Sequence, residues 1–176
     1  MKIAKILLIL LKKRLLNYKT MNYNYQLKSV ITKIRDCKEN SQKIVFTNGV
    51  FDILHVGHTR YLSKASMLGD ILVIGINSDN SVKELKGPSR PINKLEDRGL
   101  ILSELKVVDY VISFEEQTPL NLIKSIMPDV LVKGGDYTIE DVVGAREVIK
   151  SGGKVEILDF HPGHSSTHYI NQIKKH

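Results

Sequence analysis

Short apolar runs that alternate with amphipathic helical patterns constrain this chain more than any other feature of its sequence. Five runs are short, contain Ile or Val, and lack the apolar–polar alternation of half-exposed strands: residues 43–46, 71–76, 107–113, 130–132 and 155–158. Such runs are typical of strands that are buried on both faces of a sheet. Helical patterns lie between these runs and beyond them, at about residues 26–37, 57–67, 94–105, 119–126, 139–150 and 166–174.

This alternation predicts the fold class. Strands that alternate with helices form a parallel sheet, because each parallel connection must cross over the sheet, usually through a helix. We therefore predict an α/β fold, a Rossmann-like, doubly wound parallel sheet of about five strands with helices on both faces. The length of 176 residues suits one such domain.

The net charge of +7 is unevenly distributed along the chain. Six basic residues precede residue 21 and no acidic residue lies among them, so the remainder carries only +1. We therefore expect no nucleic-acid partner. The apolar stretch at residues 3–11 is too short to span a bilayer, so we expect no stable membrane insertion, although an amphipathic surface helix stays open. We expect residues 1–20 to be a disordered or non-native extension and residues 21–176 to form a single domain.

Polar segments, three of which contain glycine, follow four of the predicted strands. They comprise residues 47–49, 77–79, 133–136 and 161–167. Because the carboxyl ends of parallel strands meet at one edge of a sheet, these segments should lie together there. Ligands bind at that edge in open parallel sheets.

Two histidines, His55 and His58, stand where the first of these loops turns into a helix. Gly57 between them lets an anion approach the backbone, and a helix N-terminus favours negative charge. Imidazole groups can donate hydrogen bonds to phosphate and stabilise charge in a transition state. A metal site is less favoured, because there is no HExxH motif and no third ligand lies near in sequence. The remaining alternative is structural, with one histidine at the turn and the other half-buried.

The strings TNGVFD (residues 47–52) and HVGH (residues 55–58) resemble the signature of the HxGH nucleotidyltransferase superfamily. Three more stretches narrow the resemblance: LKGPSRPI (residues 85–92), EDR (residues 96–98) and PDVLVKGGDY (residues 128–137). Together they resemble the heptose 1-phosphate adenylyltransferase family. The resemblance covers residues 26–174.

The resemblance implies transfer of AMP from ATP to D-glycero-β-D-manno-heptose 1-phosphate, with release of pyrophosphate, for lipopolysaccharide or surface-glycan precursors. It implies Mg²⁺ with ATP, held mainly by phosphates, so no protein metal ligands are predicted. It implies catalytic positions at His55, His58, Lys86 and Arg98. It implies a nucleotide site at Thr47, Asn48, Gly49, Val50, Phe51, His55, His58, Lys133, Gly134, Asp136, Ser166 and Thr167. The expected substrate contacts are Asp52, Lys83, Arg90 and Gly135.

Several of these residues also have a plain structural interpretation. Ser166 and Thr167 suit a helix N-cap, and the glycines at 134 and 135 suit a tight turn. Basic loop side chains are usually solvated, which applies to Lys83, Lys86 and Arg90. Asp52 could simply cap its loop, and Arg98 could form a surface salt bridge.

Some positions depart from the family pattern. Val50 stands where Cys is common, while His164 and Ser166 stand where Tyr or Cys and Thr are common. Many relatives are fused to a sugar kinase, and the 176 residues of this chain contain none. We therefore expect a separate kinase to supply the sugar phosphate. We also expect a homodimer. The single cysteine, Cys37, excludes an internal disulfide and fits a cytoplasmic location.

Three alternatives stay open at this stage. The first is a cytidylyltransferase acting on glycerol 3-phosphate or a similar alcohol phosphate, although the RTEGISTT-like string of that family is FHPGHSST here (residues 160–167). The second is a heptose enzyme that uses GTP. The third is a non-catalytic nucleotide-binding module, which the retained histidines and Ser-Thr pair make less favoured.

Overall fold

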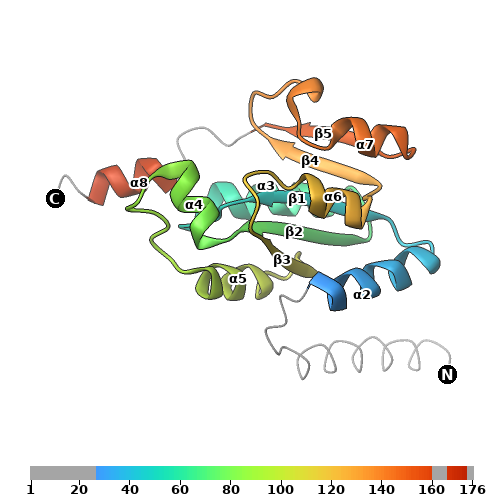
Figure 1. The fold of residues 1–176 in the computed structure, drawn as a ribbon, viewed down its shortest axis with the longest axis horizontal. Helices are drawn as coiled ribbons and strands as arrows, with labels where there is room; N and C mark the ends of the chain where they lie inside the picture. Colours follow the sequence, from blue (N-terminus) through green and yellow to red (C-terminus); the bar gives the residue numbers. More distant parts are fainter. Residues whose placement is uncertain (1–26, 160–165, 174–176) are drawn as a thin grey trace.

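The computed structural model describes residues 27–159 and 166–173, and its centre is a five-stranded sheet (Figure 1). The strands are β1 (Ile44–Gly49), β2 (Ile71–Asn77), β3 (Tyr110–Phe114), β4 (Val130–Gly134) and β5 (Lys154–Leu158). All neighbouring strands pair in parallel, in the order β3-β2-β1-β4-β5. The predicted fold class is thereby confirmed.

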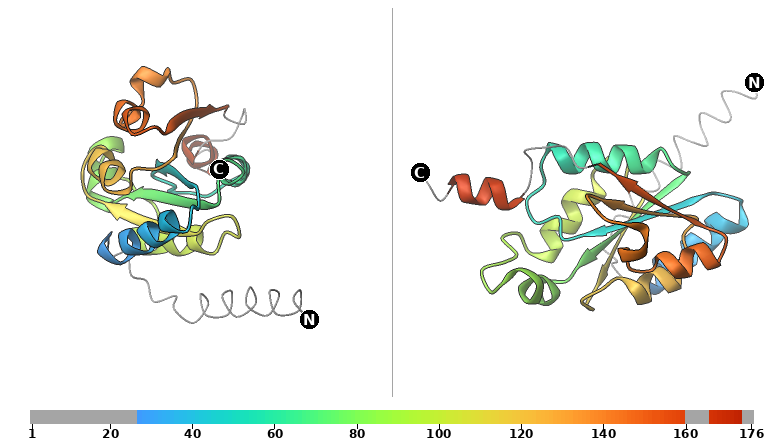
Figure 2. Two further views of the ribbon diagram at one scale, coloured as in Figure 1. Left: turned by 90° about the vertical axis from the view of Figure 1, so that its right-hand side faces the viewer. Right: turned by 90° about the horizontal axis from the view of Figure 1, so that it is seen from above.

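Helices cover both faces of this sheet. They are α2 (Leu27–Glu39), α3 (Val56–Ser66), α4 (Asp79–Lys86), α5 (Leu95–Ser103), α6 (Leu120–Ile126), α7 (Ala145–Lys150) and α8 (Ser166–Ile173), with a 3₁₀ turn, η1 (Ile139–Asp141). In the left view of Figure 2, α6 lies on one side of the sheet and α3 lies on the other. None of the helices in the described part of the chain is long and apolar enough to cross a membrane.

Two hydrophobic layers hold the helices on the sheet. Ile44 and Phe46 of β1 point into a layer with α2, α6 and α7, whereas Val45 between them points into a layer with α3 and α5. All three strand side chains are fully buried. Successive residues of a strand face opposite sides, so a strand with both sides covered must be apolar throughout. This is why the strands appeared in the sequence as unbroken apolar runs.

The strand order creates a topological switch point at β1. From β1 the chain builds outward through β2 and β3, and then returns to place β4 and β5 on the other side. Thr47 of β1 is in register with Val132 of β4, so the segments that follow these strands emerge side by side. Ligands bind at such a point in doubly wound sheets.

Three element boundaries differ from the sequence prediction. Helix α4 was not predicted; it begins after the N-cap Ser78, whose hydroxyl accepts a hydrogen bond from the Ser81 backbone N–H. The helix predicted at residues 139–150 is interrupted, because Gly144 adopts a left-handed conformation (φ 85°) between η1 and α7. Strand β3 begins only at Tyr110, since the residues before it form a turn after α5. The predicted extension at residues 1–20 and residues 161–165 of the last loop lie outside the described residues.

Candidate active site

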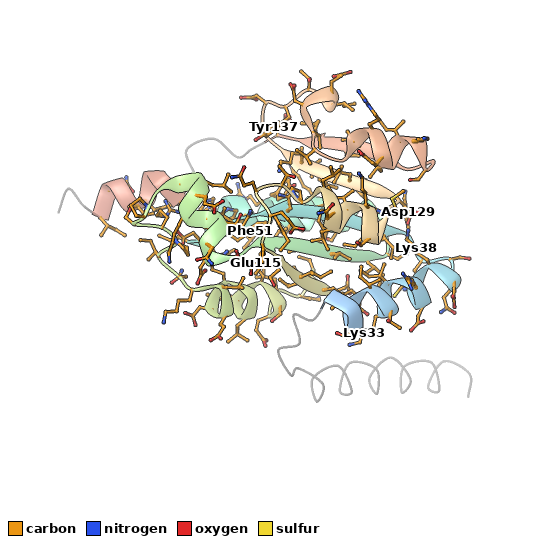
Figure 3. The ribbon with its side chains drawn as sticks, in the orientation of Figure 1. Lys33, Lys38, Phe51, Glu115, Asp129 and Tyr137 are labelled. Carbon is orange, nitrogen blue, oxygen red and sulfur yellow. The ribbon has the colours of Figure 1, made fainter. Side chains whose placement is uncertain are left out.

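The predicted site residues gather at the carboxyl edge of the sheet. Phe51, labelled in Figure 3, lies toward this edge, whereas Lys38 and Asp129 lie at the opposite, amino edge. Three segments build the edge: the loop after β1, the stretch from α4 to α5, and the end of β4.

The two histidines stack on each other at the start of α3. His55 is the N-cap residue, with extended backbone (φ −143°), and its carbonyl accepts hydrogen bonds from the N–H groups of His58 and Thr59. This turn places the two rings 3.8 Å apart, with an angle of 25° between their planes. The Phe51 ring packs against His58 at 5.2 Å between centroids. Both histidines therefore belong to one rigid cluster rather than to separate surface positions.

The electrostatic surroundings of His58 favour its neutral form. Burial, the neighbouring His55 and the positive charge of Lys86 together lower the pKa of His58 to about 4. Among the described residues, no group hydrogen-bonds to its buried Nδ1 atom. Lys86 at the end of α4 is thus close enough for its charge to act on His58. Lys83, also on α4, is exposed.

The loop after β1 is tightly folded. A Cβ atom at Gly49 would lie 2.9 Å from the Phe51 ring, and Phe51 itself has a positive φ of 48°. Such backbone strain is characteristic of functional loops. Thr47, in contrast, is fully buried, and its hydroxyl lies 2.7 Å from the Tyr61 hydroxyl, which donates to the Val132 carbonyl. In this structure the Thr47 side chain therefore connects β1 to α3.

Asp52 holds the segment that contains Arg90. Its buried carboxylate lies 2.5 Å from Arg90 Nε and accepts hydrogen bonds from the backbone N–H groups of Ile92 and Asn93. Burial alone would raise the pKa of Asp52, but these backbone donors and the Arg90 guanidinium lower it overall. The loop-capping interpretation thus describes the contacts of Asp52 in this structure.

Arg90 is nearly buried and keeps one nitrogen available. Its side chain is 10% exposed, and its Nε is paired with Asp52. The Nη2 atom is buried, and within residues 27–159 and 166–173 it finds no hydrogen-bond partner. A buried donor without a partner is costly, so this atom indicates a site for an anionic oxygen.

Arg98 differs most from its expected surroundings. Its side chain is fully buried, so the alternative of a surface salt bridge is wrong. The guanidinium donates to the carbonyls of Val50 (2.7 Å), Asn77 (2.8 Å) and Asn93 (3.0 Å), and also to a carboxylate oxygen of Asp79 (2.8 Å).

The end of β4 adds a partly buried cation beside the first loop. Lys133 Nζ donates to the Asn48 side-chain oxygen at 3.2 Å and lies 5.7 Å from the centre of the Tyr137 ring. Burial lowers the pKa of Lys133. In the strand that carries Lys133, Gly134 is buried, and Gly135 after it has a positive φ of 109°. Asp136 is exposed.

Helix α8, near the C-terminal end of the chain, contacts the loop after β1 and the histidine pair. The Ser166 hydroxyl donates to the Ile53 carbonyl at 3.0 Å, and the Tyr169 ring lies 5.6 Å from the His55 ring. Of Thr167, the structure describes the helical backbone only. Ser166, which we predicted to bind the nucleotide, thus lies on a helix whose Tyr169 is beside His55.

Sequence reasoning assigned no role to four residues that shape this edge, Tyr61, Asp79, Asn93 and Tyr169, although it placed Asp79 in the polar segment at residues 77–79. Tyr61 lies one helical turn after His58, which is the only signal that the sequence offered for it. The side chains of the other three contact segments that are distant in the sequence. Among the described residues, no three His, Cys, Asp or Glu side chains gather as a metal site.

Comparison with known proteins agrees with this geometry. The model of the cytidylyltransferase-like family matches residues 46–172. The chain is 52% identical over 150 residues to the bifunctional protein HldE of Proteus mirabilis (strain HI4320), which covers 85% of this chain and 31% of that protein. It is 52% identical over 138 residues to HldE of Escherichia coli O139:H28, covering 78% and 29%. The chain thus spans less than a third of the length of these relatives.

Two solved structures share the fold. The lipopolysaccharide core biosynthesis protein from Thermoplasma volcanium GSS1 has a TM-score of 0.56 and 33% identity, covering 68% of this chain and 97% of that chain. Pantoate-β-alanine ligase from Francisella tularensis, complexed with β-γ ATP and β-alanine, has a TM-score of 0.50 and 16% identity, covering 78% and 67%. The second similarity concerns the fold alone.

Proposed function

We propose that this chain, which belongs to the cytidylyltransferase-like family and is a nucleotidyltransferase, transfers AMP from ATP to D-glycero-β-D-manno-heptose 1-phosphate. The products are ADP-heptose, a precursor for lipopolysaccharide or another surface glycan, and pyrophosphate. Identity of about one half to the HldE proteins and the heptose-type strings at residues 85–92 and 128–137 support the choice of substrate.

The observation that carries the proposal is a set of buried cationic or polar groups at the switch point. His58 Nδ1 and Arg90 Nη2 are buried without hydrogen-bond partners among the described residues, and Lys133 is a partly buried ammonium that donates to the neutral side-chain amide of Asn48. Leaving such groups without acceptors is costly, and phosphate oxygens would satisfy them all.

The reaction needs no protein nucleophile. A phosphate oxygen of the heptose 1-phosphate forms a bond to the α-phosphorus of ATP, and the bond from that phosphorus to the bridging oxygen breaks. Pyrophosphate leaves with the bonding electron pair. Such transfers depend on positioning and on neutralising charge, and we assign these roles to the stacked histidines, Lys86 and Lys133.

In this scheme the His58 imidazole gains a proton as the nucleotide binds. Its pKa of about 4 makes it neutral near pH 7 in the ligand-free protein. A bound triphosphate favours the protonated form and raises this pKa. The imidazole then donates hydrogen bonds to oxygens whose negative charge grows in the transition state. We assign to Arg90, Lys83 and Gly135 the contacts with the sugar phosphate.

The setting of the reaction is also part of the proposal. Mg²⁺ accompanies ATP, is held mainly by phosphate oxygens and water, and supplies further charge neutralisation. A sugar kinase supplies the heptose 1-phosphate. The enzyme works as a homodimer in the cytoplasm, where ATP is available, and residues 21–176 form one nucleotidyltransferase domain.

Pyrophosphate release tests the proposal directly. ATP, CTP and GTP are each combined with heptose 1-phosphate and with glycerol 3-phosphate, using the full chain and a form that lacks residues 1–20. We expect turnover with ATP and heptose 1-phosphate only, equal in both forms. His58→Ala should lower kcat about 10²- to 10³-fold, because a donor to the developing charge is lost.

Other outcomes would replace the proposal. Turnover with CTP and glycerol 3-phosphate would identify an alcohol-phosphate cytidylyltransferase. Turnover with GTP and heptose 1-phosphate would identify a heptose enzyme that uses GTP. Full activity in a folded His58→Ala protein would remove the histidine pair from the mechanism. Unchanged thermal unfolding is the control that the variant is folded.

A further inference from the structure

We infer that Arg98 is a positioning residue that joins three stretches of the candidate active-site edge, at Val50, at residues 77–79 and at Asn93, rather than a residue that touches the nucleotide. The inference rests on the proposed nucleotidyl transfer, because it explains how the groups for that reaction are held. It departs from the contact with phosphates that the family resemblance implies for Arg98.

The contacts of Arg98 leave little of its side chain for a ligand. The guanidinium has five N–H donors, and four hydrogen bonds to protein oxygens occupy it in this structure. The side chain has no exposed surface. A nucleotide phosphate could reach it only if the surrounding loops opened.

Two of the three segments lead from Arg98 to His58. The bond to the Val50 carbonyl fixes the residue before Phe51, whose ring packs on His58. The bonds to Asn77 and Asp79 fix the start of α4, and the last turn of α4 carries Lys86, whose charge lowers the His58 pKa.

The third segment leads from Arg98 to Arg90. Arg98 Nε donates to the Asn93 carbonyl at 3.0 Å. The backbone N–H and the side chain of Asn93 bind Asp52, and the Asp52 carboxylate holds Arg90 Nε. One buried guanidinium thus sets the distances between the histidine pair, Lys86 and Arg90. Most hydrogen-bond acceptors of Arg98 are neutral carbonyls, so the role of Arg98 is more geometric than electrostatic.

Lysine cannot replace arginine in this role. Its ammonium keeps the positive charge, but its donors radiate from one nitrogen and cannot reach separate carbonyls in a fixed planar fork. Arg98→Lys therefore separates the geometric role from the charge.

The test measures the His58 pKa by NMR titration of the ligand-free protein. We expect Arg98→Lys to raise this pKa from about 4 toward the ordinary value of 6.5, since α4 with Lys86 and the Phe51 loop are no longer fixed. In the pyrophosphate assay, kcat should fall at least about 10-fold while the KM for ATP changes much less. Asp79→Ala, which removes one acceptor at a partly exposed position, should act in the same direction and covers the case in which Arg98→Lys fails to fold.

Asp97→Ala is the matched control. Asp97 precedes Arg98 on α5 and is exposed, so the His58 pKa and kcat should both stay unchanged. A folded Arg98→Lys protein with an unchanged His58 pKa and a raised KM for ATP would overturn the inference, because that result describes direct contact with the nucleotide. The titration needs no substrate, so it stands even if the proposed heptose reaction fails.

Discussion

At the scale of single residues, buried and partly buried basic groups gather at the candidate active-site edge. Lys133 and His58 both have lowered pKa values, chiefly because burial disfavours their charged forms. The buried Arg90 is paired through Nε, yet its Nη2 stays unsatisfied among the described residues. Such an arrangement costs folding stability, and perturbed basic groups of this kind cluster at functional sites. A polyanionic substrate is the ligand that such surroundings suit.

Lys86 gives a prediction at this scale. Lys86→Met removes the positive charge near the histidine pair, so the pKa of His58 should rise above its value of about 4. Titration of the histidine ring protons by NMR measures this change. Lys83→Met, on the same helix and equally exposed, is the matched control and should leave the His58 pKa unchanged. Equal pKa values in the wild-type and Lys86→Met proteins would mean that Lys86 does not lie near the histidines in solution.

At the scale of elements, glycines decide where helices begin and where loops fold closely. Gly144 separates η1 from α7 with a left-handed backbone, and a Cβ there would lie 2.7 Å from Ile123 Cδ1 in the core. Gly152 has a similar φ of 88° but has open space around its Cβ position. The two positions therefore differ in packing and not in backbone conformation.

This pair of glycines separates the two contributions. Gly152→Ala should lower the free energy of unfolding by about 1 kcal/mol, because only the left-handed conformation is disfavoured. Gly144→Ala should lower it by about 3 kcal/mol, since the new methyl group also displaces Ile123 in a packed core. Urea unfolding measures both values. Equal losses in the two variants would show that the core near Ile123 accommodates a methyl group without strain.

At the scale of the whole molecule, the site and the stability of the fold are coupled through protons. In the folded protein the pKa of His58 is about 4, against 6.5 for an unperturbed histidine. Above pH 6.5 the imidazole is unprotonated in both the folded and the unfolded state, so His58 contributes no pH dependence to the stability there. As the pH falls from 6.5 to 4, the unfolded chain binds a proton that the folded protein excludes, and stability is lost. Below pH 4 both states are protonated and the loss stops.

Comparison of the wild-type protein with His58→Gln measures this coupling. Between pH 7 and pH 5 the wild-type protein should lose on the order of 2 kcal/mol more unfolding free energy than the variant. Urea unfolding at the two pH values gives the difference. Asp52 does not interfere, because its lowered pKa keeps its contribution intact until the pH falls below 3.8. Parallel losses in both proteins would place the His58 pKa near its ordinary value.

The sequence by itself determined the order of strands and helices and the loop that carries the two histidines. These features depend on local chemistry, because apolar runs form buried strands and a polar glycine loop follows a strand wherever it folds. For the same reason, local patterns predicted the parallel sheet and its ligand-binding edge. Helix α4 and the break at Gly144 were missed, since a side-chain cap decides the first and a left-handed backbone conformation decides the second.

The tertiary structure decided what each charged residue touches. Arg98 suited a surface salt bridge or a phosphate contact equally well in the sequence, yet it is buried among oxygens from three separate segments. Asp52 and Arg90 are 38 residues apart and form one pair. Hydrogen bonds between distant segments depend on how whole elements pack, so a local sequence pattern cannot predict them. The sequence therefore identified the edge at which we propose the active site, and the packing of helices against the sheet assigned each residue its contacts there.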